Sequence, residues 1–284
     1  MIVLSEKDVQ SLLTMEAAIE VVAETMQAVS RGEATLPLRQ IMTVGGPNML
    51  GLMPGAMERP GCFGVKLVCL FPENPQFGYS SHQGAMVLFE TQHGAAVAMM
   101  NAGRLTAVRT AAASAVATRV LAREDSTVLT IVGTGEQAEF HLDAMLAVRP
   151  IRRVRVVGRR PERAEAFVSL ARSHHPDVTF EWGTDVKAAV EGADIVCTVT
   201  AANEPILFGD WIAPGTHLNV VGASVPSKTE IDQELVVRSA LFADYRPSIF
   251  AQAGELIGAI EAGRVGQDHL RAEIGEVLAG DRPG

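Results

Sequence analysis

The sequence predicts an α/β protein of two parts, with an α+β first half and a doubly wound parallel sheet in the second half. Its 284 residues are enough for two domains of about 150 residues each. Beyond residue 126, apolar runs of strand length alternate with helical segments, which is the pattern of a parallel sheet. A glycine-rich turn joins the first of these strands to a helix. With 48% hydrophobic and 20% charged residues, the chain can bury a sizeable core.

Residues 5–31 carry apolar positions at helical spacing and stop at Gly32, which predicts one helix. From Leu36 to about Met100, short apolar runs are separated by glycine, proline and asparagine, which predicts strands. The clearest of these runs are 62–71, 84–90 and 95–100. The alanine-rich segment 103–122 predicts a long helix. The first half is therefore expected to be α+β.

The second half repeats strand and helix in turn. Strands are expected at 127–132, 153–157, 178–182, 194–200, 217–222 and 240–244. Helices are expected from about Glu136, from Pro161 and at 185–191, and two more helical segments follow the last strand.

Composition excludes several classes of function. No apolar stretch reaches the ~18 residues of a membrane span, and the N-terminus lacks the pattern of a secretory signal. Three cysteines without a CxxC pair fit a reducing cytosol, so we expect a cytoplasmic protein. No metal site is expected, because no clustered ligands are visible and the adjacent His174 and His175 are interpreted as solvated loop residues. A net charge of −9 gives no attraction to nucleic acid, so neither nucleic acid nor a membrane is an expected partner.

The turn Gly133-Thr134-Gly135-Glu136-Gln137-Ala138 lies directly between an apolar strand and a helix. In such a turn the first glycine makes the bend and the second lets the backbone approach a pyrophosphate, while alanine is an accepted third residue. The N-terminus of the helix adds free N–H groups and positive potential. Because the turn lies inside a strand–turn–helix–strand unit, it predicts a Rossmann-type dinucleotide site rather than a turn without a ligand.

In such folds an acidic residue about 20 positions further on binds the ribose 2′-hydroxyl of NAD. Here Gly158 stands at that position and is followed by Arg159 and Arg160. Guanidinium groups bind phosphate bidentately, so NADP(H) is the expected cofactor and NAD(H) the alternative. The other interpretation is a solvated basic face, and it is the one we expect for Arg152 and Arg155.

Three cations of the first half stand in apolar surroundings. Lys66 lies in a run that is apolar on both faces, so it is expected to be largely buried. Arg109 is expected on the packing stripe of its helix, whereas Arg39 is a weaker case. Each alone could have an internal carboxylate partner or reach water. Three together, with few acids nearby, favour a shared anionic ligand, for which a small carboxylate is the natural candidate.

Four stretches of the sequence resemble the ornithine cyclodeaminase/mu-crystallin family, and most closely its mu-crystallin and ketimine-reductase branch. They are "KLVCLFPENPQFGYSSHQGAMVLFE", "GRLTAVRTAAASAVATRVLA", "IVGTGEQAEFH" and "TVTAANEPILFGDWIAPGTHLNVVGASVPSKTEID". The resemblance runs from about Met1 to Gly280. It implies a substrate-binding and dimerisation domain at 1–115, through which a homodimer forms, and an NAD(P)-binding Rossmann domain at 116–284. A C-terminal return segment typical of the family is expected to be absent.

The resemblance also implies site residues. Arg39, Lys66 and Arg109 match residues that hold the substrate carboxylate, and Ser81, His82 and Gln83 match the loop lining that pocket. Together with the glycine-rich turn, the resemblance implies cofactor contacts from Arg109, Thr110, Gly133, Thr134, Gly135, Glu136, Gln137, Gly158, Arg159, Arg160, Arg163, Thr198, Val199, Thr200, Val221, Gly222 and Ala223.

Ser224 stands where ornithine-cyclising members of the family carry an acid–base aspartate, and the reductase branch has serine there too. We therefore expect an NADP(H)-dependent reductase of small imino acids, equivalently an amino-acid dehydrogenase in reverse, with Lys66 and Ser224 as catalytic residues. One alternative is ornithine cyclodeaminase, which converts L-ornithine to L-proline and ammonia. Another is a non-catalytic NADP-dependent ligand-binding protein.

Overall fold

The computed structural model covers residues 1–284 and divides into two compact units, Met1–Thr110 and Ala111–Gly284. The boundary falls inside helix α3 (Ala102–Leu121), which contributes turns to both units. Each unit has a sheet of its own, mixed in the first and parallel in the second.

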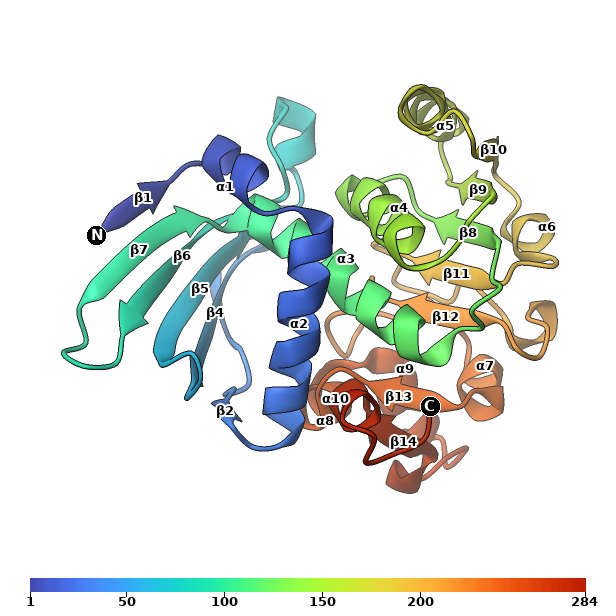
Figure 1. Ribbon diagram of the computed structural model, residues 1–284. Coiled ribbons are helices and arrows are strands. Elements are labelled where there is room, and N and C mark those ends of the chain that lie inside the picture. Colours follow the sequence, from blue (N-terminus) through green and yellow to red (C-terminus); the bar gives the residue numbers. More distant parts are fainter. The chain divides into compact units, whose positions relative to one another are not determined.

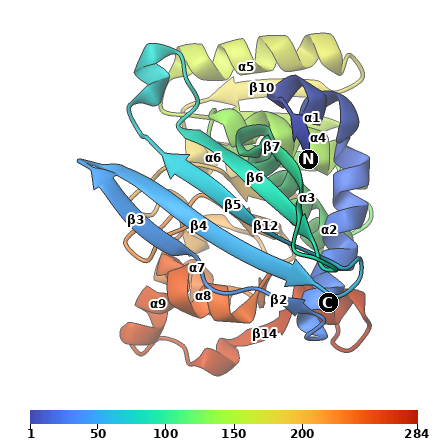
Figure 2. The ribbon, with the colours of Figure 1, turned by 90° about the vertical axis from the view of Figure 1, so that its left-hand side faces the viewer.

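The first unit contains a seven-stranded sheet with the order β1-β7-β6-β5-β4-β2 (Figure 1), and β3 pairs with β4 (Figure 2). Its strands are β1 (Ile2–Leu4), β2 (Ala34–Thr35), β3 (Gln40–Gly45), β4 (Asn48–Met57), β5 (Cys62–Leu70), β6 (His82–Glu90) and β7 (Ala96–Asn101). The strands expected between Leu36 and Met100 are confirmed. β1 was not expected, because three residues are too few to show an alternating pattern.

The helix expected over 5–31 is in fact two helices, α1 (Glu6–Leu12) and α2 (Met15–Ser30). The break is at Thr14, whose hydroxyl accepts a hydrogen bond from the Ala17 N–H at 3.2 Å. A threonine that caps a new helix in this way offers the backbone an alternative to continuing the preceding one. Apolar periodicity runs across the break and therefore did not reveal it.

The two faces of the first sheet differ. Along β5, Phe63 and Val65 alternate with Lys66, so they lie on the opposite face from it. The Lys66 side chain contacts Thr106 of α3, which identifies the face that α3 covers. Figure 2 shows the other face turned toward the viewer, with α2 and α3 behind the sheet. That second face is not covered by any helix of its own unit.

The second unit contains a five-stranded, all-parallel sheet with the order β10-β9-β8-β11-β12. Its strands are β8 (Val128–Val132), β9 (Arg153–Val157), β10 (Thr179–Gly183), β11 (Ile195–Thr198) and β12 (His217–Val220). The predicted Rossmann-type sheet is confirmed. The strand order reverses direction beside β8, and in open α/β sheets ligands bind at such a point, beyond the carboxyl ends of the strands.

One strand expected near the end does not join this sheet. Residues 240–244 form β13 (Leu241–Ala243), which pairs in parallel with β14 (Leu270–Glu273) in a separate two-stranded sheet. β14 lies inside the tail that was expected to be helical. Four residues are too few for periodicity to separate a strand from a helical turn.

The helices of the second unit follow its strands as expected for a doubly wound sheet. They are α4 (Glu136–Val148), α5 (Pro161–His174), α6 (Val186–Val190), α7 (Gln233–Arg238), α8 (Arg246–Gln252), α9 (Gly254–Glu261) and α10 (Ile274–Leu278). His174 is the last residue of α5 rather than a loop residue, and His175 Nε2 lies 3.6 Å from Asp143 Oδ1. None of the helices combines the length and apolar character that crossing a membrane requires.

Candidate functional site

Lys66 is the centre of a group of three cations in the first unit. Its ammonium group donates to Thr106 Oγ1 at 3.4 Å, and that hydroxyl donates to the Ala102 carbonyl at 2.6 Å. Burial, and to a lesser extent the positive charges of Arg109 and Arg39, together lower the pKa of Lys66 to about 7. The three cations therefore lie close enough to repel one another. A bound anion would relieve that repulsion.

The burial of Lys66 agrees with the expectation, whereas that of Arg109 does not. Most of Lys66 is buried, and Arg109 is exposed. The packed stripe of α3 runs through residues such as Ala107, Val108 and Ala111, so Arg109 lies beside it rather than on it. A shift of one position turns a side chain by about 100° around a helix, which sequence spacing did not resolve here.

Ser81, His82 and Gln83 lie where β6 begins. The Phe71 N–H donates to the Ser81 carbonyl at 2.9 Å, and Ser81 Oγ lies 3.1 Å from His82 Nδ1. β5 and β6 pair Leu70 with His82 and Cys69 with Gln83. Because side chains alternate along a strand, His82 shares a face with Lys66 and Gln83 lies on the other face. The structure thus brings only part of this loop to the side of Lys66.

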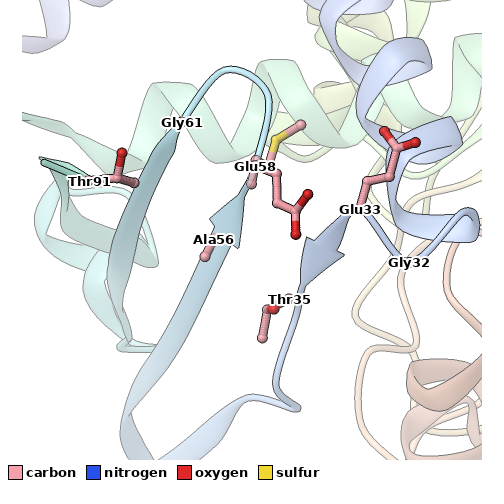
Figure 3. A pocket seen from close by; sticks show the side chains of 8 residues that line it. Gly32, Glu33, Thr35, Ala56, Glu58, Gly61 and Thr91 are labelled. Atoms are coloured by element: carbon pink, nitrogen blue, oxygen red, sulfur yellow. The ribbon is translucent and has the colours of Figure 1, made fainter.

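A pocket of about 330 Å³ opens elsewhere in the first unit. Figure 3 shows the side chains around it. It is lined by Gly32, Glu33, Thr35, Ala56, Met57, Glu58, Gly61 and Thr91. None of the expected site residues lines it. Its two carboxylates, Glu33 and Glu58, would repel a carboxylate substrate, although Arg59 lies 3.5 Å from Glu33. We therefore do not assign the substrate to this pocket.

The glycine-rich turn of the second unit has the geometry that a bound pyrophosphate needs. Gly133 has φ +126°, and a Cβ there would lie 2.8 Å from the Val199 carbonyl oxygen, so only glycine fits. Gly135 is the N-cap residue of α4, no side chain caps the helix there, and a Cβ on Gly135 would meet no atom within 4 Å. Gln137 Oε1 is buried and has no hydrogen-bond partner within the chain. Uncapped N–H groups, open space and an unpartnered acceptor fit a dinucleotide.

The carboxyl end of β9 carries the glycine that replaces the ribose-binding acid. A Cβ on Gly158 would lie 2.8 Å from Thr134 Cγ2, so the two loops approach closely. Arg159, Arg160 and Arg163 follow and are exposed. Their guanidinium groups make no hydrogen bond or ion pair within the chain, which leaves them free for an anion.

The solvated basic face expected for the neighbouring arginines is wrong in one case. Arg155 donates to the carbonyl groups of Ala189 at 3.1 Å and Glu191 at 2.5 Å, and it lies 3.5 Å from Glu181. It is therefore a structural residue that joins β9 to the end of α6. Arg152 is exposed, as expected.

Three of the expected cofactor-binding residues at the ends of β11 and β12, Thr198, Thr200 and Gly222, donate hydrogen bonds to Glu230, which the sequence did not point to. Glu230 is fully buried, and its carboxylate accepts hydrogen bonds from the Thr198 hydroxyl, from both the N–H and the hydroxyl of Thr200, and from the Gly222 N–H. Val199 is buried, Val221 and Ala223 are half-buried, and Ser224 is exposed. An acidic residue in a loop carries no signal in a single sequence that distinguishes it from a solvated one, so Glu230 was not found.

Comparisons with known proteins agree with these features. The whole chain, residues 1–284, matches the family model described as "Ornithine cyclodeaminase/mu-crystallin family". Ketimine reductase mu-crystallin of Mus musculus is 36% identical over 253 residues, which cover 89% of this chain and 77% of the mouse protein.

Two solved structures are also similar over the whole chain. One is the Thermococcus litoralis Delta(1)-pyrroline-2-carboxylate reductase in complex with NADH and L-proline, with 34% identity, a TM-score of 0.96 and 88% of that chain covered. The other is an archaeal alanine dehydrogenase dimer with bound NAD, with 30% identity, a TM-score of 0.92 and 86% of that chain covered. The expected resemblance is thereby confirmed: the chain belongs to the ornithine cyclodeaminase/mu-crystallin family.

Proposed function

We propose that this protein is an NAD(P)H-dependent reductase of small imino acids. The second unit supplies the dinucleotide site, and the first unit supplies cations for the substrate carboxylate. Relatives with names such as ketimine reductase and Delta(1)-pyrroline-2-carboxylate reductase support a C=N substrate. In this assignment residues 1–115 bind substrate and residues 116–284 bind cofactor.

The observation that carries the proposal is that the chain has both a dinucleotide-binding turn, in the second unit, and a group of cations around Lys66, in the first unit. Gly133 closes a turn that only glycine can adopt, at the switch point of a parallel sheet. Lys66 has a pKa of about 7, and the positive charges of Arg109 and Arg39 contribute to that low value. A nucleotide-binding turn without the cations would indicate only a dinucleotide-binding domain. The cations add a site for a small anion.

The roles of the residues follow from their chemistry. Arg39 and Arg109 hold the substrate carboxylate by charge-assisted hydrogen bonds. Lys66 exchanges a proton near neutral pH and protonates the amine nitrogen as the C=N bond is reduced. Ser224 donates a hydrogen bond to that nitrogen or to a water, and Ser81 and His82 limit the space around the substrate. The bound nicotinamide supplies the hydride.

We propose that NADPH binds more tightly than NADH. Support comes from Gly158 in place of an acid, and from Arg159 and Arg160, whose guanidinium groups have no partner within the chain. A 2′-phosphate would find two free guanidinium groups and no opposing carboxylate. Arg159→Ala with Arg160→Ala should lower NADPH affinity by about one to two decades and leave NADH affinity nearly unchanged. Equal affinities of the unaltered protein for both cofactors would refute the preference.

We also propose a homodimer that forms through the first unit. The uncovered face of its sheet carries exposed apolar side chains, among them Val3 at 62%, Met42 at 53%, Phe63 at 37% and Met99 at 37% exposure. An apolar face of this kind on one side of a sheet favours association with a partner surface. The archaeal alanine dehydrogenase to which the chain is similar is a dimer.

The activity is tested with a panel of preformed cyclic imino acids, and of keto acids mixed with amines, followed by NADPH absorbance. Oxidation of NADPH that requires both protein and imine supports the proposal. Tight cofactor binding without turnover of any member would indicate a ligand-binding protein instead. Arg109→Met should abolish turnover, since the guanidinium holds the substrate carboxylate.

A further inference from the structure

Glu230 is a buried carboxylate without a cationic partner, and it ties together two loops of the second unit. Its side chain is 0% exposed and accepts four hydrogen bonds of 2.6 to 2.8 Å from Thr198, Thr200 and Gly222. Burying a carboxylate is costly unless hydrogen bonds compensate. Here all the donors come from the carboxyl ends of β11 and β12, where a doubly wound sheet binds its ligand.

The backbone of Glu230 is also fixed. Its N–H donates to Glu255 Oε1 at 2.9 Å, and its carbonyl accepts from the N–H groups of Ile206 at 2.8 Å and Leu207 at 3.0 Å. These hydrogen bonds anchor the backbone that carries the carboxylate. The carboxylate therefore links the loops after β11 and β12 to an anchored segment of the chain.

The packing around Gly222 shows how closely the loops are held. A Cβ on Gly222 would lie 2.1 Å from the Thr200 carbonyl oxygen and 2.5 Å from Glu230 Oε1. Only glycine lets the β12 loop reach the carboxylate. Val221, Ala223 and Ser224 are the neighbours of this glycine, so their positions depend on the same contact.

We propose that Glu230 is a positioning residue that sets the two loops against the nicotinamide half of the cofactor and so aligns Ser224. The inference rests on the proposed function and deepens it. Each carboxylate oxygen accepts one backbone N–H, Thr200 N at Oε1 and Gly222 N at Oε2. A carboxamide has only one acceptor oxygen, so Glu230→Gln leaves one backbone N–H facing an N–H donor in either orientation.

Glu230→Gln therefore separates positioning from general stability. The test compares NADPH with 2′-phospho-ADP-ribose, which has the adenylate and pyrophosphate parts but no nicotinamide. We expect NADPH affinity to fall about tenfold or more and affinity for the fragment to stay within about twofold. Amide hydrogen exchange at 198–200 and 221–224 should become faster. Thr200→Val, which removes one of the four bonds, should shift both readouts less in the same direction.

Glu255→Gln is the matched control. It also removes a buried carboxylate, but its amide oxygen still accepts from the Glu230 N–H, so NADPH affinity should not change. Unchanged NADPH affinity and unchanged loop exchange in Glu230→Gln would overturn the inference, as would an equal loss for both ligands. Unaltered protein that bound neither ligand would refute the proposed function. Hydrogen exchange would still decide whether Glu230 holds the loops.

Discussion

At the scale of single residues, Lys66 is a group whose charge changes near neutral pH. Its pKa of about 7 lies below the ordinary lysine value of 10.5, mainly because of burial and then because of Arg109 and Arg39. Between these two pKa values the unfolded chain holds a proton that the folded chain has released. Stability therefore rises with pH across this window, as the cost of the buried ammonium disappears.

Lys66→Met should remove both the free-energy cost of burying the ammonium group and the proposed catalytic group itself. Relative to the unaltered protein, the variant should gain most stability below pH 7, and the gain should vanish as the pH approaches 10.5. Urea unfolding at pH 6 and at pH 9.5 measures this difference. Imine reduction should fall about 100-fold. Lys7→Met, at an exposed position, is the control and should change neither quantity. A stability difference that does not vary with pH would contradict the assignment.

Ser224 decides between imine reduction and ornithine cyclisation. Cyclisation needs a group that accepts a proton from the amine and returns one to the departing ammonia. A serine hydroxyl does not do this unaided. We expect no ammonia release from L-ornithine with NAD⁺ or NADP⁺. Reduction of cyclic imino acids by the same preparation shows that the protein is active. Formation of proline with an equal amount of ammonia would show that another residue supplies the base.

At the scale of elements, Arg149 secures the end of α3. Its guanidinium is buried and donates to the carbonyl oxygens of Thr118 at 2.7 Å, Arg119 at 3.0 Å and Ala122 at 2.7 Å. The Arg119 and Ala122 carbonyl groups lie at the end of the helix, where carbonyl groups lack partners within the helix, whereas the Thr118 carbonyl also accepts the Ala122 N–H at 3.0 Å. A cation there also interacts favourably with the negative end of the helix dipole.

Arg149→Met should lower the free energy of unfolding by about 2–4 kcal/mol, because it leaves several buried carbonyl groups unsatisfied. Chemical denaturation measures the change. Arg152→Met, at an exposed position three residues away, should stay within about 0.5 kcal/mol of the unaltered protein. NADPH affinity should be retained in both variants. Equal stability of the two variants would show that Arg149 is not needed to cap α3.

Helices and strands were predictable where an apolar pattern extends over many residues or where a turn needs particular residues such as glycine. The strand–glycine–helix unit around Gly133 and the alanine-rich helix α3 are examples. The break at Thr14 and the pairing of β13 with β14 were not predictable. The first depends on one hydroxyl capping a helix, and the second on contacts between segments nearly 30 residues apart that are too short to show a period.

Site residues divide in the same way. Lys66 was predictable because an ammonium group between apolar positions stands out. Arg159 was predictable because it follows Gly158, which stands where NAD-binding folds carry an acidic residue. The exposure of Arg109 and the face of Gln83 depend on the rotation of a helix and the register of a strand. Glu230 depends on contacts with Thr198 and Thr200, 32 and 30 residues away, and with Gly222 in another loop, for which a single sequence holds no signal.

At the scale of the whole molecule, the proposed dimer forms through the uncovered face of the first sheet, and a substitution on that face tests this. Phe63 stacks on Phe89 at a centroid distance of 5.1 Å on that face. Phe63→Glu should convert a dimer to a monomer in sedimentation velocity, because a carboxylate would be buried at the interface. Leu170→Glu, at an exposed apolar position of α5, is the control and should remain dimeric. A dimer that survives Phe63→Glu would exclude this face.

The most direct test of the central claim follows the hydride itself. NADPH carrying deuterium at C4, prepared in each stereochemical form, is incubated with the protein and a cyclic imino acid such as Δ1-pyrroline-2-carboxylate, and the product is analysed by mass spectrometry. We predict one deuterium on the carbon that carries the carboxylate, from only one of the two forms, because the protein presents a single face of the nicotinamide. An amino acid product without deuterium from either form, or no product at all, would contradict the account.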